Sequence, residues 1–205
     1  MKYLKYSIFI IMFIVPILFW YKNKSNREKF NYSTLIKCEN IRDIIKIYGK
    51  ESIIDHGQYE FEGQPIENSS KYTILSGSKN QFEIVYLENT TIYGFDQIES
   101  EWILPLNLKI GMSLSDLEKT NQAPVSFYGF EIDYQTSGLV TNWHEGKLSK
   151  LEGLSLEANI IPSETYSSDP NNNQLSGSHL NSEMSFVRDG NLKLGRIELI
   201  KLNKQ

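Results

Sequence analysis

Residues 110–148 read IGMSLSDLEKTNQAPVSFYGFEIDYQTSGLVTNWHEGKL, and this stretch decides the predicted fold. Ser113, followed three residues later by Asp116, is a capping-box signal for the start of a helix. The serine oxygen can accept from a free backbone N–H of the first turn, and the aspartate favours the positive end of the helix dipole. Asn121 can end the helix in a left-handed conformation, and Pro124 prevents its continuation. Short apolar and aromatic runs broken at glycines then predict antiparallel strands joined by turns.

The same helix-start pattern occurs earlier in the chain. Residues 40–46 (NIRDIIK) match residues 113–119 (SLSDLEK) in the cap, the aspartate, two apolar positions and the lysine, 73 residues apart. Strand-like sequence follows both, which indicates a duplicated unit, although two ordinary capped helices would give the same match. We therefore expect an α+β protein of two tandem units, residues 33–104 and 105–205, each with helix packed on an antiparallel sheet.

The remaining segments extend this prediction. A helical pattern covers residues 35–48, and further strands are expected at residues 71–75, 81–87, 90–95, 102–106, 125–134, 139–143, 148–160, 184–187 and 192–202. Residues 76–80 (SGSKN) favour a hairpin turn between two of these strands. The apolar alternation of the last strand slips near Gly195, which suggests a bulge.

Composition excludes several classes of protein. The 205 residues are 40% hydrophobic and include 12 Tyr, 10 Phe and 3 Trp, enough for a packed core and too many for a disordered chain. The net charge is −4, and residues 1–29 are basic, so the rest of the chain is still more acidic. Such a body would repel phosphates, which argues against nucleic-acid binding. The single cysteine, Cys38, cannot form an intrachain disulfide and is expected to be a buried or half-buried thiol.

The N-terminus predicts attachment to a membrane. Residues 6–21 carry no charge and end in Trp20-Tyr21, residues typical of the membrane–water boundary. Residues 4–21 approach the roughly 20 residues needed to cross a bilayer, and a polar linker follows at residues 22–32. Residues 1–21 could instead be a cleaved signal peptide, which would make the protein secreted, but the flanking sequence lacks the small-residue cleavage pattern. We expect an uncleaved anchor, with the body outside the cytoplasm.

Motifs for chemistry are weak. The histidines are His56, His144 and His179, and none lies in an H-E-x-x-H pattern, so no metal site is predicted. Ser113 belongs to no G-x-S-x-G motif. Asp133 and Glu145 flank an aromatic-rich segment and, with His144, define the alternative prediction of a hydrolase. The expected function is nevertheless non-catalytic, and no cofactor is predicted.

Aromatic residues indicate a binding surface in the second unit. Five lie within a short span: Phe127, Tyr128, Phe130, Tyr134 and Trp143. Tyr and Trp on a sheet face provide large contact areas for a protein partner, although the same residues could equally form the core of a small sheet. We predict a binding face around Tyr128, Tyr134, Trp143 and His144. In a continuous strand the His144 side chain would point to the opposite side from Trp143, so both can serve one face only if a turn begins there, which Gly146 would allow.

The pattern of residues 111–121 (GMSLSDLEKTN), followed by 127–134 (FYGFEIDY), Trp143 and 146–148 (GKL), resembles a group of uncharacterised bacterial envelope proteins. The helix-then-sheet order also resembles the tandem β-lactamase-inhibitor-protein-like fold and its single-unit relative, the outer-membrane assembly lipoprotein SmpA. This second resemblance implies helices on one face of an antiparallel sheet and a non-catalytic protein-binding or envelope-assembly role. No inhibitor contact motif is matched, so the resemblance assigns no binding residue.

Overall fold

The computed structural model describes residues 28–130, 138–162 and 179–203. Its helices are α2 (Tyr32–Leu35), α3 (Ile41–Tyr48), η1 (Lys50–Ser52), η2 (Pro105–Asn107), α4 (Leu114–Asn121), η3 (Lys147–Lys150) and α5 (Ser185–Asp189). Its strands are β1 (Ile53–Asp55), β2 (Glu60–Phe61), β3 (Gln64–Pro65), β4 (Ser70–Ile74), β5 (Phe82–Tyr86), β6 (Thr90–Phe95), β7 (Ser126–Phe127), β8 (Val140–Asn142), β9 (Leu154–Pro162), β10 (Leu180–Asn181) and β11 (Leu192–Leu202).

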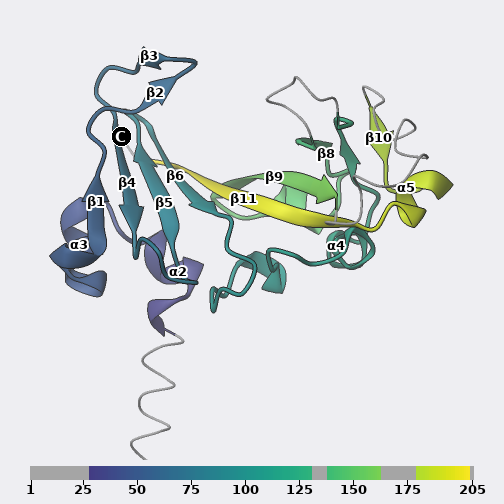
Figure 1. The fold of residues 1–205 in the computed structure, drawn as a ribbon, viewed down its shortest axis with the longest axis horizontal. Coiled ribbons are helices and arrows are strands. Elements are labelled where there is room, and N and C mark those ends of the chain that lie inside the picture. The colour runs from purple at the N-terminus through teal and green to yellow at the C-terminus, as the bar shows by residue number, and fades with distance from the viewer. Residues whose placement is uncertain (1–27, 131–137, 163–178, 204–205) are drawn as a thin grey trace, which may run out of the picture.

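The main sheet has six antiparallel strands in the order β1-β4-β5-β6-β11-β9. β4 and β5 form the predicted hairpin, with Ile74 opposite Phe82. β11 is long enough to pair with β6 at one end and with β9 along nearly its whole length, and Figure 1 shows this ribbon joining the two ends of the molecule. The register of β11 shifts between Leu194 and Arg196, which confirms the bulge expected near Gly195.

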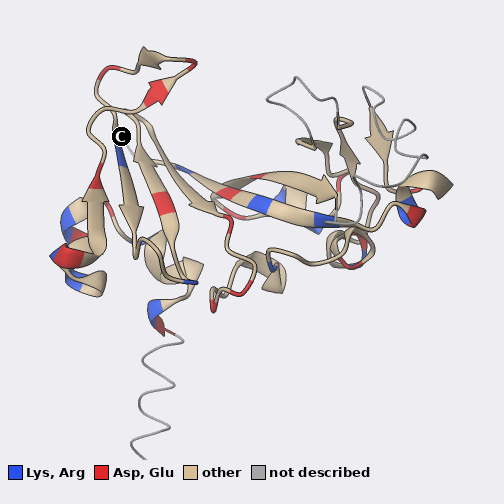
Figure 2. Ribbon diagram, viewed as in Figure 1, with Lys and Arg blue, Asp and Glu red and all other residues tan. Residues whose placement is uncertain are grey.

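Helices cover one face of this sheet near the N-terminal half. Ile44 and Tyr48 of α3 are buried against it, and the Tyr93 hydroxyl donates to the Leu35 carbonyl oxygen over 3.1 Å. Trp102 lies at the centre of an aromatic cluster, with its ring centroid 4.8 Å from that of Phe82. Cys38 is 4% exposed, which confirms the predicted buried thiol, and burial raises its pKa. The opposite face carries Glu83 of β5 together with Arg196 and Glu198 of β11, which form ion pairs. Figure 2 marks the charged residues along these strands.

The predicted fold class is wrong. Strands provide most of the regular structure in the described residues, and they form several antiparallel sheets rather than one per unit. The main sheet draws β1, β4, β5 and β6 from residues 33–104 and β9 and β11 from residues 105–205. A three-stranded sheet, β10-β7-β8, and the β2–β3 hairpin are separate. Backbone hydrogen bonds join strands regardless of their distance in sequence, so the pattern of each half did not reveal which strands would share a sheet.

Local differences have local causes. Residues 184–187 were expected to form a strand, but α5 begins at Ser185. A segment of four residues is too short to distinguish the helical period of 3.6 residues from the strand period of 2. Asn121 is the last residue of α4, and Gln122 takes the left-handed conformation in its place, with φ 59°. The helix expected at residues 35–48 is shorter, because α2 ends at Leu35 and α3 begins only at Ile41. The strand expected at residues 102–106 is not formed, and η2 begins at Pro105.

No helix among the described residues is both long and apolar enough to cross a membrane. The transmembrane anchor included in the predicted fold, residues 1–21, lies outside the described residues, as does most of the linker at residues 22–32. The domain boundary predicted between residues 104 and 105 and the duplication both stay predictions.

Candidate functional site: the outer face of the three-stranded sheet

The three-stranded sheet sorts its side chains into two faces. β7 lies in the middle, and Ser126 is opposite both Asn142 of β8 and Asn181 of β10. The neighbouring residue, Phe127, is 0% exposed and faces the core, as does Leu180 opposite it. Because side chains alternate along a strand, Ser126 and Asn181 point to the other side. We call this side, with Ser126, Tyr128, His144, His179 and Asn181, the outer face.

Asn121 fixes the turn that brings His144 to the outer face. Its side chain is fully buried, and its amide nitrogen donates to the Trp143 carbonyl oxygen over 2.8 Å. Its amide oxygen accepts from the Leu148 N–H over 3.0 Å. A Cβ on Gly146 would collide with this carboxamide, so the turn requires glycine there. Residues 143–148 are therefore held against the end of α4, because a buried amide must find its hydrogen-bond partners inside the protein.

His144 lies in this turn with φ 48°, in the left-handed region, and its ring reaches back to β7. Its Nε2 is 2.7 Å from Ser126 Oγ and 3.4 Å from Asn181 Nδ2. The Glu183 N–H donates to Asn181 Oδ1 over 2.8 Å, so Asn181 presents its amide nitrogen, which donates to Ser126 Oγ over 3.1 Å. The Ser126 hydroxyl, which accepts this bond, can donate its own proton to His144 Nε2, and in that arrangement Nδ1 is the protonated nitrogen of a neutral ring.

Tyr128 and His179 extend the outer face beyond the serine. Their ring centroids are 5.1 Å apart, and the planes are inclined at 40°. Tyr128 is half-buried and His179 is exposed. The Tyr128 N–H donates to the Leu139 carbonyl oxygen over 2.9 Å, which holds the residue beside the segment that leads into β8. The outer face thus combines an aromatic–imidazole pair with a hydrogen-bonded polar chain.

β8 ends at Asn142, so His144 lies in the turn that follows and not in a continuous strand, and the side chain that points away from the outer face is that of Trp143. Its ring packs against the core, and its indole N–H donates to the Leu156 carbonyl oxygen over 3.3 Å. This contact satisfies a carbonyl of β9. Tyr134, the fourth residue of the predicted binding face, lies outside the described residues. The structure therefore brings together Tyr128 and His144 and separates Trp143 from them.

The residues of the alternative enzymatic prediction are only partly placed. Asp133 lies outside the described residues, and Glu145 is exposed at φ 59° and makes no hydrogen bond or ion pair within the described ranges. His144 instead contacts Ser126, and the distance from its Nε2 to Ser126 Oγ is one that a catalytic base keeps from its nucleophile. In the part of the chain that the structure describes, no group bonds His144 Nδ1 to orient the ring.

The three histidines do not converge. His56 Nε2 lies 2.8 Å from Thr73 Oγ1, in the N-terminal half of the main sheet. Within residues 28–130, 138–162 and 179–203, no group of three or more His, Cys, Asp and Glu side chains could hold a metal ion. Ser126, His179 and Asn181 were absent from the predicted site. Alternation with Tyr128 could have indicated Ser126, but the β7–β10 pairing that adds His179 and Asn181 joins segments more than 50 residues apart.

Comparisons with models of protein families, with curated proteins and with solved structures found no match to this chain. The site therefore has to be interpreted from its own geometry.

Proposed function

We propose that this chain is a non-catalytic protein-binding module of the cell envelope, and that its partner contacts the outer face of the three-stranded sheet. The observation that carries the proposal is the hydrogen-bonded chain from Asn181 through Ser126 to His144, beside the Tyr128–His179 pair. These bonds hold polar side chains in place before a partner arrives. A partner then loses less side-chain entropy on binding, which is the main benefit of a preorganised surface.

The residue types also suit a protein partner. Tyrosine provides a large, rigid contact area with few rotatable bonds, and the serine, asparagine and histidine offer both donors and acceptors. Because Trp143 packs into the core, Tyr128 is the aromatic anchor of the proposed surface. Its side chain is half-buried and lies beside the exposed His179 ring, so part of its surface remains accessible to a partner.

The envelope location rests on the N-terminal sequence. We propose that residues 4–21 remain attached and hold the body on the extracytoplasmic side of a membrane, because they form an uncharged run ending in Trp20-Tyr21. Mass spectrometry of the native protein tests this part by itself. An intact N-terminus in the membrane fraction is expected, and an N-terminus beginning after about residue 21 would show a cleaved signal.

Site-specific photocrosslinking tests the binding surface in the full chain. A benzophenone amino acid in place of Tyr128 should cross-link one discrete partner in intact membranes. The matched control carries the same group at Ser155, an exposed position of β9 outside the outer face. Adding His144→Ala to the Tyr128 probe should abolish its product. Equal products from both positions, or a product from Ser155 alone, would contradict the proposed surface.

The Ser126–His144 contact favours one second candidate, a hydrolase. Its distance of 2.7 Å would let the histidine accept the serine proton during attack on an ester or amide. A fluorophosphonate probe decides between the two candidates, since it labels activated serines. Labelling of Ser126 that disappears in His144→Gln would support the hydrolase and overturn the non-catalytic proposal.

A further inference from the structure

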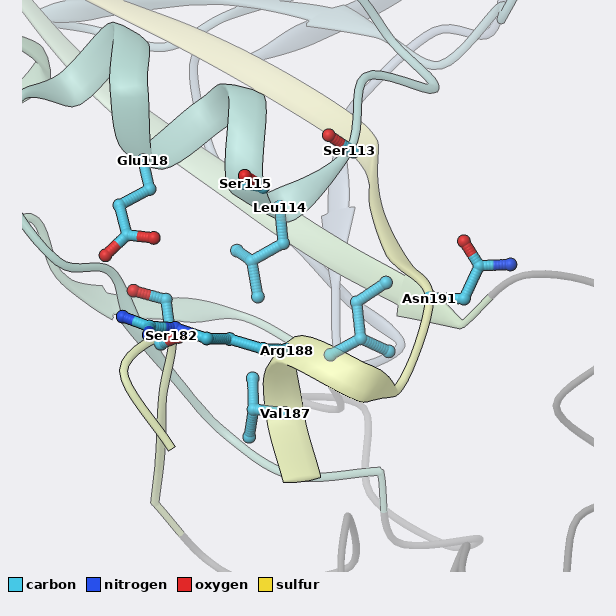
Figure 3. Close-up of a pocket in the computed structure, with 9 residues that line it drawn as sticks. Ser113, Leu114, Ser115, Glu118, Ser182, Val187, Arg188 and Asn191 are labelled. Carbon is cyan, nitrogen blue, oxygen red and sulfur yellow. Dashed lines mark hydrogen bonds between the residues drawn. The ribbon is translucent and has the colours of Figure 1, made fainter. Parts of the chain in front are cut away.

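The apolar side chains around the cavity between α4 and α5 are already covered by the protein itself. Leu114, Val187 and Leu192 line this cavity (Figure 3), and each is at most 5% exposed. They leave almost no surface for a ligand, and the remaining lining residues are polar. Apolar side chains that the fold leaves in solvent are better placed to make a further contact.

Two such side chains lie in residues 96–113, which join β6 to α4 and are called here the connecting segment. Ile98 is 55% exposed, and Leu106, in η2, is 42% exposed. The Gly111 N–H donates to the Leu194 carbonyl oxygen of β11 over 2.7 Å, and Ile98 packs over Gly111, where a Cβ would lie 2.9 Å from its Cγ2. The connecting segment is therefore fixed to the main sheet and presents both apolar side chains to the solvent.

The connecting segment lies beside the point where the described chain begins. The Ile103 N–H donates to the Phe30 carbonyl oxygen over 2.8 Å, and the Tyr32 N–H donates to the Ile103 carbonyl oxygen over 3.1 Å. The rings of Phe30 and Trp102 also pack edge to face, with centroids 5.5 Å apart. Figure 1 shows α2 and the connecting segment on the lower side of the molecule and the β2–β3 hairpin on the upper side.

This lower side is also the one nearest the proposed membrane anchor. Six residues, 22–27, separate the anchor from Glu28, the first described residue. An extended chain spans at most about 3.6 Å per residue, so Glu28 lies within about 25 Å of the end of the anchor. Such a short tether holds the neighbouring surface at a high effective concentration of lipid. A contact too weak to bind a membrane by itself is then sufficient.

The charges of the connecting segment do not prevent contact with lipid. Two of its three carboxylates form ion pairs, Glu101 with Lys79 over 2.7 Å and Asp96 with Arg196 over 3.7 Å. The third, Glu99, is exposed, and the exposed Lys109 carries the opposite charge in the same segment. Zwitterionic headgroups, which carry both charges, can solvate these two side chains while the aliphatic ones go deeper.

We propose that Ile98 and Leu106 rest in the interface of the bilayer that holds residues 4–21, so that the body lies on the membrane through the connecting segment and α2. Aliphatic side chains gain free energy when they leave water for the boundary between headgroups and acyl chains. This orientation points the β2–β3 hairpin away from the membrane. The inference rests on the proposed anchor and is separate from the outer face.

Fluorescent labels at four single positions test this orientation in the full chain. Ile98→Cys and Leu106→Cys, in a Cys38→Ala background, carry an environment-sensitive nitrobenzoxadiazole label in phosphatidylcholine vesicles. Both labels should emit at shorter wavelength and lose at least about half of their intensity to lipid with a nitroxide near the headgroup. The matched controls Phe61→Cys and Leu202→Cys replace apolar side chains that are 57% and 73% exposed on the side away from α2, and should stay unquenched.

A second set of variants tests whether the apolar side chains cause the contact. With the label at Asn107→Cys, beside Leu106, the pair Ile98→Ser and Leu106→Ser should reduce quenching at least about twofold. The matched pair Phe61→Ser and Ile66→Ser removes two exposed apolar side chains of the β2–β3 hairpin and should leave quenching unchanged. Melting temperatures identify any variant that fails to fold, and Cys38→Ser then replaces the alanine background.

Flotation with the vesicles separates this inference from the anchor on which it rests. A full chain that does not float overturns both. A chain that floats, with labels at Ile98→Cys and Leu106→Cys as unquenched as that at Phe61→Cys, overturns the orientation and leaves the anchor in place. A shift to shorter wavelength without quenching by the nitroxide lipid also overturns it, because the labels would then lie against protein.

Discussion

Arg196 of β11 reaches across β6 to Glu83 of β5, with its Nη2 2.9 Å from Glu83 Oε2. The strand between them carries Gly94, where a Cβ would lie 2.7 Å from that same nitrogen. Because Gly94 has no side chain, the Arg196 guanidinium can cross β6 at this position. Lys71 of β4 also pairs with Glu83 over 3.0 Å, and Arg196 Nε bonds Glu198 over 2.9 Å. This charge cluster on the face of the main sheet opposite the helices joins β11 to the β4–β5 hairpin.

Gly94→Ala should destabilise the wild-type protein by about 1–2 kcal/mol, because the added methyl group displaces Arg196 and breaks a charged hydrogen bond. In an Arg196→Ala background the same change should instead stabilise by about 0.5 kcal/mol, since alanine is otherwise better than glycine inside a strand. Urea unfolding of the four variants measures both values. The same sign in both backgrounds would show that the passage over Gly94 does not matter.

The stability of the protein should decrease in acid partly through Glu83. Burial alone would raise the pKa of Glu83, but hydrogen bonds from Arg196 and Lys71 hold it below the ordinary value of 4.5. A carboxyl with a lowered folded-state pKa contributes stability that is complete above the unfolded pKa and is lost as pH falls through the folded one. The free energy of unfolding should therefore fall below about pH 4.5. Glu83→Gln should flatten this decrease, and the exposed Glu152→Gln should not.

Asn121→Ala should cost about 2–4 kcal/mol of stability, because it leaves the Trp143 carbonyl oxygen and the Leu148 N–H unpaired in the interior. Gly146→Ala should have an effect of similar size, since its methyl group would displace the same carboxamide. Thr141→Ala, at an exposed position of β8, is the control and should change stability by less than about 0.5 kcal/mol. Denaturant unfolding measures all three. A mild effect of both core changes would mean that the turn has other supports.

The hydrogen-bond chain on the outer face predicts one tautomer. If the Ser126 hydroxyl donates to His144 Nε2, the neutral imidazole must carry its proton on Nδ1, the less common form in free histidine. Nitrogen-15 chemical shifts of the ring above pH 8 report the tautomer directly. Ser126→Ala should move His144 toward the Nε2-protonated form without unfolding the protein, whereas His56, bonded to Thr73, should not change. An Nε2–H signal in the wild type would show that His144 Nε2 donates to Ser126 Oγ, which contradicts the predicted direction of this hydrogen bond.

Features that depend on neighbouring residues could be predicted from the sequence alone. The Asp116 N–H donates to Ser113 Oγ over 3.1 Å, and the Arg42 N–H donates to Asn40 Oδ1 over 2.9 Å, so both helix caps are confirmed. The β4–β5 hairpin and the bulge near Gly195 were predicted for the same reason. In the caps and the hairpin turn the residues that interact lie a few positions apart, so backbone preference and side-chain chemistry restrict the outcome locally. The bulge was visible because the apolar alternation slips within β11 itself.

The candidate site divides in the same way. Tyr128 and His144 were predicted because aromatic and imidazole side chains are recognisable in any sequence. Their partners were not, because Ser126 meets Asn181 only through the pairing of β7 with β10. Alternation would separate Trp143 from His144 only in a continuous strand, but β8 ends at Asn142 and the buried Asn121 holds the turn that follows. Neither this turn nor the bond from Trp143 to the Leu156 carbonyl oxygen could be predicted from the sequence.

Only the tertiary structure decided which strands share a sheet. β6 and β11 pair with Thr91 opposite Lys201, and Arg196 reaches Glu83 across 113 residues of sequence. Backbone hydrogen bonds are the same for every residue, so a strand's pattern shows which face is buried without naming its neighbour. Which strands become neighbours depends on how all the apolar faces are buried together. The sequence of either half alone does not determine this, because β11 pairs with β6 from the first half and with β9 from the second.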